Sequence, residues 1–141
     1  MDVKIVENDK EQEEAFQIRK TVFVKEQHVP VEEEIDKFEK DCTHFLLYDR
    51  GKPAGAGRFR IMDGYGKVER ICILPEVRGK GAGRRLMLAI EDFAGKQGVS
   101  KLKLNAQTHA IPFYEKLGYR VTSDEFLDAG IPHKAMEKTL K

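Results

Sequence analysis

The sequence predicts a single α/β domain in which helices cover a mixed β-sheet. The chain has 141 residues, which is enough for one hydrophobic core and typical of one domain. Apolar spacing and turn residues give the element order β-α-α-β-β-β-α-β-α-β-β. This order combines hairpins with one strand–helix–strand crossover. It therefore favours a mixed sheet over a doubly wound parallel sheet.

The N-terminal part is predicted to begin with a strand and to continue into helices. Residues 3–8, VKIVEN, have the composition of a short strand. From Asp9 a helix is expected because apolar positions recur at helical spacing. The acidic segment 28–41, opened by Pro30, is expected to be a second, partly helical segment. The periodic residues of the first helix are Ala15, Phe16, Ile18, Arg19, Val22 and Phe23.

The middle of the chain is predicted to form antiparallel strands. Residues 44–62 have the pattern of a hairpin with a turn at 49–52, and two glycines loosen its second strand. After Asp63-Gly64, residues 67–74 form the strongest predicted strand, which Pro75 ends.

The second half is predicted to alternate helices and strands. A helix is expected over 82–97, with an apolar face that includes Leu86 and Ile90 and with Gly98 as its stop. The remaining expected elements are a strand over 99–106, a short helix over 109–118, the start of a strand at 119–123 and a last strand over 133–140.

Composition argues against several classes of protein. No apolar run approaches the roughly 18 residues of a membrane helix, and the first ten residues lack the basic and apolar regions of a signal peptide. Cys42 and Cys72 form neither a disulfide framework nor a metal-ligand motif. We therefore expect a cytoplasmic protein with no metal and no membrane partner.

Charge is unevenly distributed along the chain. Residues 1–50 carry 14 acidic and 8 basic residues, a net charge of −6, whereas residues 51–141 carry 10 and 17, a net charge of +7. This division suggests one surface for an anionic cofactor and another for a cationic substrate. Chance solvation of helix faces explains it equally well.

The stretch RGKGAGRR, residues 78–85, places four cations and three glycines between a predicted strand and a predicted helix. The helix dipole opposes cations at this end unless an anion lies between them. Glycines let backbone N–H groups approach an anion closely, and no Ser, Thr, Asp or Asn is present to cap the helix. The segment predicts a diphosphate site with Arg78, Lys80, Arg84 and Arg85 as countercharges.

The spacing within this stretch excludes two common phosphate-binding motifs. A P-loop needs Gly-Lys followed by Ser or Thr, and a dinucleotide fingerprint needs glycine where Arg84 stands. What remains is R-x-x-G-x-G, formed by Arg78, Gly81 and Gly83. Here the sequence resembles the GNAT superfamily of N-acetyltransferases, whose acetyl-CoA signature has this form.

Two further segments carry the same resemblance. NAQTHAIPFYEKLGYRV, residues 105–121, is similar to the family's second conserved block, which contains F-Y-x-x-L-G-[FY]. AFQIRKTVFVKEQ, residues 15–27, is similar to the N-terminal helix of small bacterial members. The resemblance covers essentially the whole chain as one domain, 1–141. It implies a GNAT fold, with a mixed, mostly antiparallel six- to seven-stranded sheet flanked by about four helices.

The resemblance also implies an activity. Acetyl-CoA would donate its acetyl group to a primary amine, small-molecule or peptidyl, by direct attack in a ternary complex. The pantetheine arm would pair with the backbone of Ile71, Cys72 and Ile73, where this strand and the next splay apart. The other implied cofactor contacts are Arg78, Gly79, Lys80, Gly81, Ala82, Gly83, Arg84 and Asn105.

Two side chains are candidates for proton transfer. A primary amine is mostly protonated at neutral pH, and Glu69 could accept its proton if burial raises the carboxyl pKa. An ion pair with a basic neighbour is the competing interpretation for Glu69, and His28 and His109 are weaker base candidates. Tyr114 matches the family's general-acid tyrosine, which would protonate the departing thiolate. The alternative interpretation is that Tyr114 only packs against other aromatic side chains.

Three other features have a structural alternative. Cys72 beside the thioester suggests an acyl-enzyme, but no base is placed to activate it, and a small buried hydrophobe is the better interpretation. Asn105 could bond cofactor amides or simply form a turn. The acidic run 32–36 could attract a polyamine, an aminoglycoside-like compound or a lysine side chain, or it could be a solvated helix face.

Two other functions compete with catalysis. A GNAT-fold protein could bind acyl-CoA without turnover, as a sensor or a partner subunit. Nucleic-acid binding is disfavoured because no aromatic residues are interleaved with the cations around Lys80. The sequence does not choose between a monomer and a homodimer.

Overall fold

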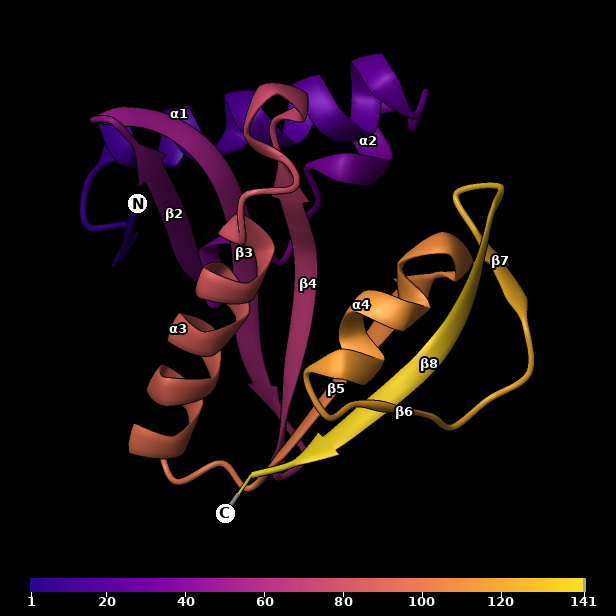
Figure 1. The fold of residues 1–141 in the computed structure, drawn as a ribbon. Helices are drawn as coiled ribbons and strands as arrows, with labels where there is room; N and C mark the ends of the chain where they lie inside the picture. The colour runs from indigo at the N-terminus through magenta and orange to yellow at the C-terminus, as the bar shows by residue number, and fades with distance from the viewer. Residues whose placement is uncertain (141) are drawn as a thin grey trace.

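The computed structural model describes residues 1–140, which form an eight-stranded sheet with helices on both faces (Figure 1). The strands are β1 (Asp2–Ile5), β2 (Thr43–Asp49), β3 (Lys52–Met62), β4 (Tyr65–Ile73), β5 (Lys101–Gln107), β6 (Arg120–Val121), β7 (Phe126–Asp128) and β8 (Ile131–Thr139). The α-helices are α1 (Asp9–Arg19), α2 (Val31–Glu34), α3 (Ala82–Lys96) and α4 (Ile111–Lys116).

The strand order confirms the predicted mixed, mostly antiparallel sheet. The order is β1-β2-β3-β4-β5-β8-β6, and β7 pairs with β8. Every pair is antiparallel except β4 with β5, which α3 connects as the one parallel crossover. The short β6 and β7 raise the number of strands to eight, above the six or seven expected.

Two hydrophobic clusters hold the layers together. On one face of the sheet, Leu46, Ala56 and Cys72 pack with the apolar side of α1. On the other face, Leu86 and Ile90 of α3 are fully buried among side chains from β2, β3, β4 and β5. Burial of one stripe on each helix is what the predicted helical periods required.

The N-terminal helix extends beyond α1 with a different hydrogen-bond pattern. The side chain of Asn8 caps α1 by accepting a hydrogen bond from the N–H of Glu11 at 2.9 Å. Beyond Arg19 the helix continues as a π-helix, Lys20–Glu26. The expected second helical segment over 28–41 is only the single turn of α2 and a 3₁₀ turn, Glu39–Asp41.

Three strand connections are two-residue turns. Both turn residues have positive φ at Arg50–Gly51, Asp63–Gly64 and Ala129–Gly130, as the right-handed twist of a hairpin favours. The first lies within the turn predicted over 49–52, and the second precedes the strand predicted over 67–74. The strand expected over 119–123 is reduced to β6, and the predicted last strand begins earlier, at Ile131.

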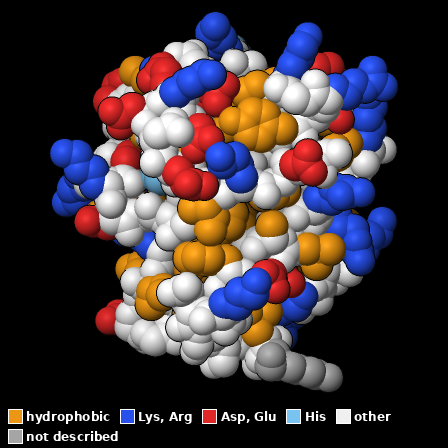
Figure 2. All heavy atoms as spheres, turned by 90° about the vertical axis from the view of Figure 1, so that its left-hand side faces the viewer, with side chains coloured by type: hydrophobic (Ala, Val, Ile, Leu, Met, Phe, Trp, Pro, Cys, Tyr) orange, Lys and Arg blue, Asp and Glu red, His pale blue; other side chains and the backbone are white. Residues whose placement is uncertain are grey.

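One face of the molecule carries charged side chains of both signs. Figure 2 shows most of its acidic side chains toward the upper left, with basic ones interspersed, and a row of lysines and arginines along its right-hand edge. None of the helices within residues 1–140 is long and apolar enough to cross a membrane.

The pairing of β4 with β5 depends on a glycine, which gives a stability prediction. A Cβ at Gly66 would overlap the Phe59 ring and come within 2.7 Å of Leu102 Cδ2. We expect Gly66→Ala to lower the free energy of unfolding by about 1–3 kcal/mol, measured by urea denaturation.

The matched control is Gly95→Ala in the last turn of α3, where a Cβ would meet no atom within 4 Å. This change should stabilise the protein by about 0.5–1 kcal/mol, because alanine favours the helix. Equal unfolding free energies for the two variants would contradict the packing described for Gly66.

Candidate functional site

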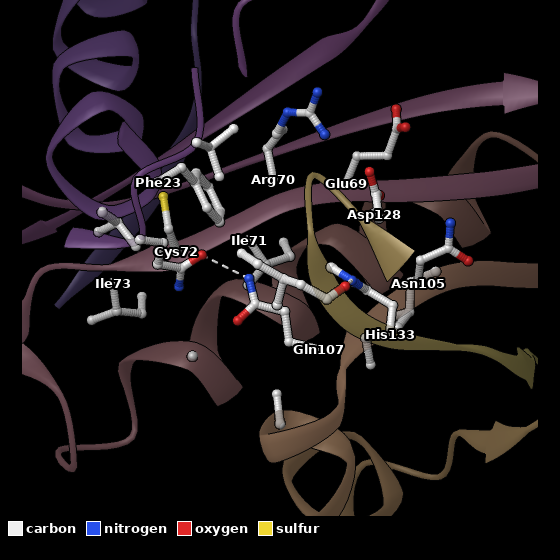
Figure 3. Close-up of a pocket in the computed structure, with 18 of the residues that line it drawn as sticks. Phe23, Glu69, Arg70, Ile71, Cys72, Ile73, Asn105, Gln107, Asp128 and His133 are labelled. Atoms are coloured by element: carbon white, nitrogen blue, oxygen red, sulfur yellow. Dashed lines mark hydrogen bonds between the residues drawn. The ribbon is translucent and has the colours of Figure 1, made fainter. Parts of the chain in front are cut away.

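A cleft of about 1510 Å³ opens where β4 and β5 diverge. The two strands pair only at Gly66–Leu102 and Lys67–Lys103. Beyond these pairs the edge of β4 that faces β5 has no strand partner among the described residues. Figure 3 shows residues 69–73 of β4 on one wall and side chains from β5 and β8 on the other. The predicted splaying of the two strands is therefore confirmed.

A one-residue bulge in β4 sets which side chains enter the cleft. Between the pairs Ala56–Cys72 and Arg58–Glu69, β3 has one residue and β4 has two, Arg70 and Ile71. Arg70 has a φ of 60°, in the left-handed region. Because of the extra residue, Glu69 and Arg70 lie on the same side of the sheet, while Ile71 packs into the cluster under α3.

Part of one sheet face is left open and forms the far wall of the cleft. Register places Lys67 beside Lys103, and Gln107 beside His133. Since side chains two apart on a strand share a face, these residues and Asn105 lie on the α1 side of the sheet. There α1 packs over β2, β3 and β4, whereas α4 lies on the other side of β5 and β8 (Figure 1).

A charge-balanced ionic network connects this face to the N-terminal segments. Arg19 and Arg58 are each only 1% exposed, and Arg19 donates to Glu34 at 2.7 Å and to Glu39 at 2.7 Å. Arg58 binds both oxygens of Asp36 at 2.9 Å. The network consists of Arg19, Arg58, Arg60 and Arg70 with Glu34, Asp36, Glu39 and Glu69.

This network changes the interpretation of the acidic run 32–36. Glu34 is buried against Arg19 and Arg70, and Asp36 is shared by Arg58 and Arg70. These two carboxylates are neutralised within the protein. Only Glu32 and Glu33 of the run are exposed at the cleft and can attract a cation from solvent.

The loop before α3 has the geometry of an anion site. Gly79 and Gly81 have φ values of 79° and 82°, and no side chain caps α3. The N–H groups of Ala82, Gly83 and Arg84 have no acceptor within residues 1–140, since the first helical bond is from Arg85 N–H to the Gly81 carbonyl at 3.1 Å. The loop thus offers unsatisfied donors beside the cleft.

The four cations of this loop are not equivalent. Arg78 forms a two-pronged ion pair with Glu26, with both distances 2.7 Å, and its Nε donates to the Ile73 carbonyl at 2.9 Å. Arg78 therefore has a partner inside the protein, although the sequence suggested a free countercharge. Lys80, Arg84 and Arg85 form no ion pair in the part of the chain that the structure describes.

The cleft gathers almost all of the predicted site residues. Lys80 and Arg85, both predicted as countercharges, do not line it. The predicted residues that do are Glu69, Ile71, Cys72, Ile73, Arg78, Gly79, Gly81, Ala82, Gly83, Arg84, Asn105 and Tyr114.

Two predicted residues are buried beside the cleft. Tyr114 is 9% exposed and packs edge-to-face on Phe113 and Tyr119. Burial raises the pKa of its phenol, which therefore keeps its proton at neutral pH. Burial likewise raises the pKa of the Cys72 thiol to about 12. Cys72 is therefore a packed thiol and not a thiolate, which agrees with the interpretation of Cys72 as a small buried hydrophobe.

Glu69 is ion-paired, as its competing interpretation proposed. Its Oε1 lies 3.2 Å from Arg58 Nε and 3.0 Å from Arg60 Nε, although the second contact lacks hydrogen-bond geometry. The weaker base candidates His28 and His109 are exposed, and the His109 ring is bonded to Gln107 Oε1 at 2.7 Å.

Three further cleft residues were not found from the sequence. Gln27 and Gln107 meet across the cleft, where Gln107 Nε2 donates to Gln27 Oε1 at 2.7 Å (Figure 3). His133 lines the same space from β8. Gln27 and Gln107 lie within the segments 15–27 and 105–121 that carry the family resemblance, but nothing in those segments singles them out, and no motif covers His133. Each comes to line the cleft only when distant segments meet in the fold.

Comparison with known proteins identifies related chains. The family model described as an acetyltransferase (GNAT) domain matches residues 6–140. The chain is 54% identical over 139 residues to the "uncharacterized N-acetyltransferase YjcF" of Bacillus subtilis strain 168, covering 98% of this chain and 99% of that protein.

Solved structures share the fold. An acyl-CoA N-acyltransferase from Pseudomonas aeruginosa superposes with a TM-score of 0.87 at 24% identity, covering 98% of this chain and 99% of that one. An aminoglycoside 6′-N-acetyltransferase complexed with coenzyme A gives a TM-score of 0.78 at 15% identity, covering 99% and 97%. At these identities the likeness is one of fold.

The ionic network makes stability depend on pH in the acidic range. Burial alone would raise the pKa of Asp36, but hydrogen bonds from Arg58 and the Phe38 N–H and the charges of Arg58 and Arg70 lower it to about 2. Because the folded-state pKa is depressed, the stabilisation is present above about pH 4 and is lost as pH falls toward about 2.

Asp36→Asn should be less stable than the wild-type protein near neutral pH and should lose less stability on acidification. The free energy of unfolding in urea, measured for both proteins between neutral pH and about pH 2, tests this prediction. Parallel pH profiles for the two proteins would contradict it.

Proposed function

This chain belongs to the GNAT acetyltransferase family, and on that premise we propose that it transfers an acetyl group from acetyl-CoA to a primary amine, with both substrates bound at once. The observation that carries the proposal is the continuity of the cleft. It runs from the uncapped start of α3, past the unpaired edge of β4, to the open polar face of β5 and β8. One end suits an anionic donor and the other a polar acceptor.

The donor would be held by backbone groups and by two free cations. The N–H groups at the start of α3 suit a pyrophosphate, with Arg84 and Lys80 as countercharges. The free edge of β4 at Ile71, Cys72 and Ile73 suits amides of an extended chain, which would pair with it as a further strand does. Arg78, held by Glu26, would fix the loop's position more than neutralise the phosphates.

The chemistry would be direct aminolysis of the thioester. The amine nitrogen attacks the acetyl carbonyl carbon, the C–N bond forms, and the C–S bond breaks. Tyr114 is a general acid for the departing sulfur, because its buried phenol keeps a proton to donate. Its hydroxyl makes no hydrogen bond to another group in residues 1–140, so it is free to face the sulfur.

A covalent acyl-enzyme is disfavoured by the state of Cys72. The thiol is 5% exposed and donates weakly to the Ala56 carbonyl at 3.8 Å. With a pKa of about 12, almost none of it is thiolate at neutral pH. Direct attack in a ternary complex needs no such nucleophile.

Binding without turnover is the alternative, and it makes a different prediction for acetyl-CoA. A sensor would be stabilised by acetyl-CoA but would release no CoA thiol in the presence of any amine. Spermidine, kanamycin and Nα-acetyl-lysine amide sample three shapes of primary amine and serve as acceptors in a thiol-release assay.

Ligand binding to the folded state gives the first test. Acetyl-CoA and CoA at about 100 times their dissociation constants should stabilise the protein by about 2.7 kcal/mol and raise its melting temperature, whereas ATP and NAD should raise it less. The reason is that only the CoA compounds carry both a pyrophosphate for the loop and an amide chain for β4. An equal rise in melting temperature with all four compounds would show that the loop does not select CoA, and would contradict the proposed donor site.

Removing the phenol of Tyr114 tests the chemical step. Tyr114→Phe should lower kcat by about 10²-fold while leaving the KM for acetyl-CoA nearly unchanged, because the ring still packs and only the proton donor is lost. Tyr119→Phe is the matched control, since Tyr119 bonds Glu91 at 2.8 Å outside the cleft. Equal kcat for Tyr114→Phe and the wild-type protein would remove Tyr114 from the mechanism.

A further inference from the structure

We infer that His133 is the base that takes the proton from the acceptor amine. This inference rests on the proposed function and names a catalytic residue that the sequence did not suggest. An ammonium cannot attack a thioester until it has lost a proton, so the acceptor side of the cleft needs a group able to accept it. Four observations point to His133.

The first observation is position. His133 lies near the start of β8, paired in register with Gln107 of β5 on one side and with Phe126 of β7 on the other. It lines the cleft from the open face of the sheet (Figure 3). Across the cleft from it lie Glu69 and Arg70, on the β4 wall where the thioester would bind.

The second observation is that the imidazole is held rigidly. His133 is 8% exposed, and its ring stacks on Phe126 with centroids 6.0 Å apart and planes 21° from parallel. Its Nδ1 lies 2.6 Å from the Ile131 carbonyl oxygen. A base fixed by packing and a hydrogen bond needs no reordering when the substrate arrives.

The third observation fixes the tautomer. A carbonyl oxygen only accepts hydrogen bonds, so Nδ1 must carry the proton that is donated to Ile131. In the neutral ring Nε2 then has the free lone pair. Nε2 has no partner in residues 1–140, and it is not one of the fully buried polar atoms left without one. The Nε2 atom is therefore accessible from the cleft and can accept a proton from a bound amine.

The fourth observation is the charge around the ring. The titratable groups that face it are Asp128 from β7, Glu69, Arg70 and Lys67 from β4, and His109 beyond Gln107. Asp128 is exposed and forms no ion pair in the described part of the chain, so its carboxylate can offset an imidazolium. The Glu69 carboxylate already lies against the guanidinium groups of Arg58 and Arg60, at 3.2 and 3.0 Å, so its Oε1 is engaged within the protein and does not face the cleft unpartnered as His133 Nε2 does.

The step balances as follows. His133 Nε2 takes one proton from the ammonium and becomes imidazolium, and the neutral amine attacks the acetyl carbon. After the attack the nitrogen carries two protons and a positive charge. As the C–S bond breaks, the thiolate takes a proton from Tyr114, and the nitrogen gives one of its protons to restore the phenol and becomes the neutral amide. The products are the N-acetyl amine and CoA thiol, and the imidazolium releases its proton to solvent.

The test is His133→Asn, because the Asn amide can keep the hydrogen bond to the Ile131 carbonyl while the base is lost. With the best acceptor among spermidine, kanamycin and Nα-acetyl-lysine amide, kcat/KM for the amine should fall about 10²-fold near neutral pH. The deficit should shrink toward pH 10, because the free amine then exists without a catalyst. The KM for acetyl-CoA should not change.

Two comparison variants separate this role from a structural one. His109→Asn removes the other histidine next to Gln107 and should keep the wild-type pH dependence. Glu69→Gln should lower activity by a factor that does not vary with pH, because this substitution breaks an ion pair but leaves the proposed base in place. A wild-type pH profile in His133→Asn would overturn the inference.

A second measurement uses the unmodified protein and does not depend on a variant folding. Diethylpyrocarbonate should carbethoxylate His133 at Nε2, and the acceptor should protect it, as peptide mass spectrometry would show. Lack of modification at His133 would overturn the inference. Absence of amine acetylation by the wild-type protein would instead overturn the proposed function, together with every role that rests on it.

Discussion

The bulge at Arg70 is the constraint on which the site depends. One extra residue in β4 places Glu69 and Arg70 on the same side of the sheet and sends Ile71 into the core under α3. The positive φ of Arg70 is strained for a side chain of that size, and the α2 segment holds it there. Arg70 donates to the Glu33 and Glu34 carbonyls and to Asp36, each at 3.2 Å. The N-terminal helices therefore fix the wall of the cleft as well as cover the sheet.

The two charged halves of the chain have different uses. Three carboxylates of the acidic N-terminal half, those of Glu34, Asp36 and Glu39, neutralise buried arginines inside the protein. The basic half keeps Lys80, Arg84 and Arg85 exposed beside uncapped N–H groups. The asymmetry in sequence thus corresponds to one internal network and one loop with the geometry of an anion site. At the cleft, the exposed carboxylates of Glu32, Glu33 and Asp128 remain to attract a cationic acceptor.

Local signals in the sequence were enough to predict the elements that form the proposed donor side of the cleft, but not those that form the proposed acceptor side. The strand, the glycine loop, α3 and Tyr114 follow from residues close together in the chain, and all were placed correctly in the fold. The ion pair of Glu69 with Arg58 was open in the sequence because β3–β4 register decides it. His133 acquires its place only when β8 inserts between β5 and β6, about 26 residues beyond its partner Gln107 in the chain. The bulge leaves no signal because arginine does not mark a left-handed residue as glycine would.

Hydrogen–deuterium exchange with and without CoA would test the central claim most directly, namely that the donor lies along the free edge of β4 and against the start of α3. The account predicts slower exchange, on CoA binding, at the backbone amides of residues 70–73 and 79–84, with little change in β1 and β2. Protection of those segments would place the donor in the opening between β4 and β5. If CoA bound but left those amides unprotected, the donor would lie elsewhere, and the account of the cleft would be wrong.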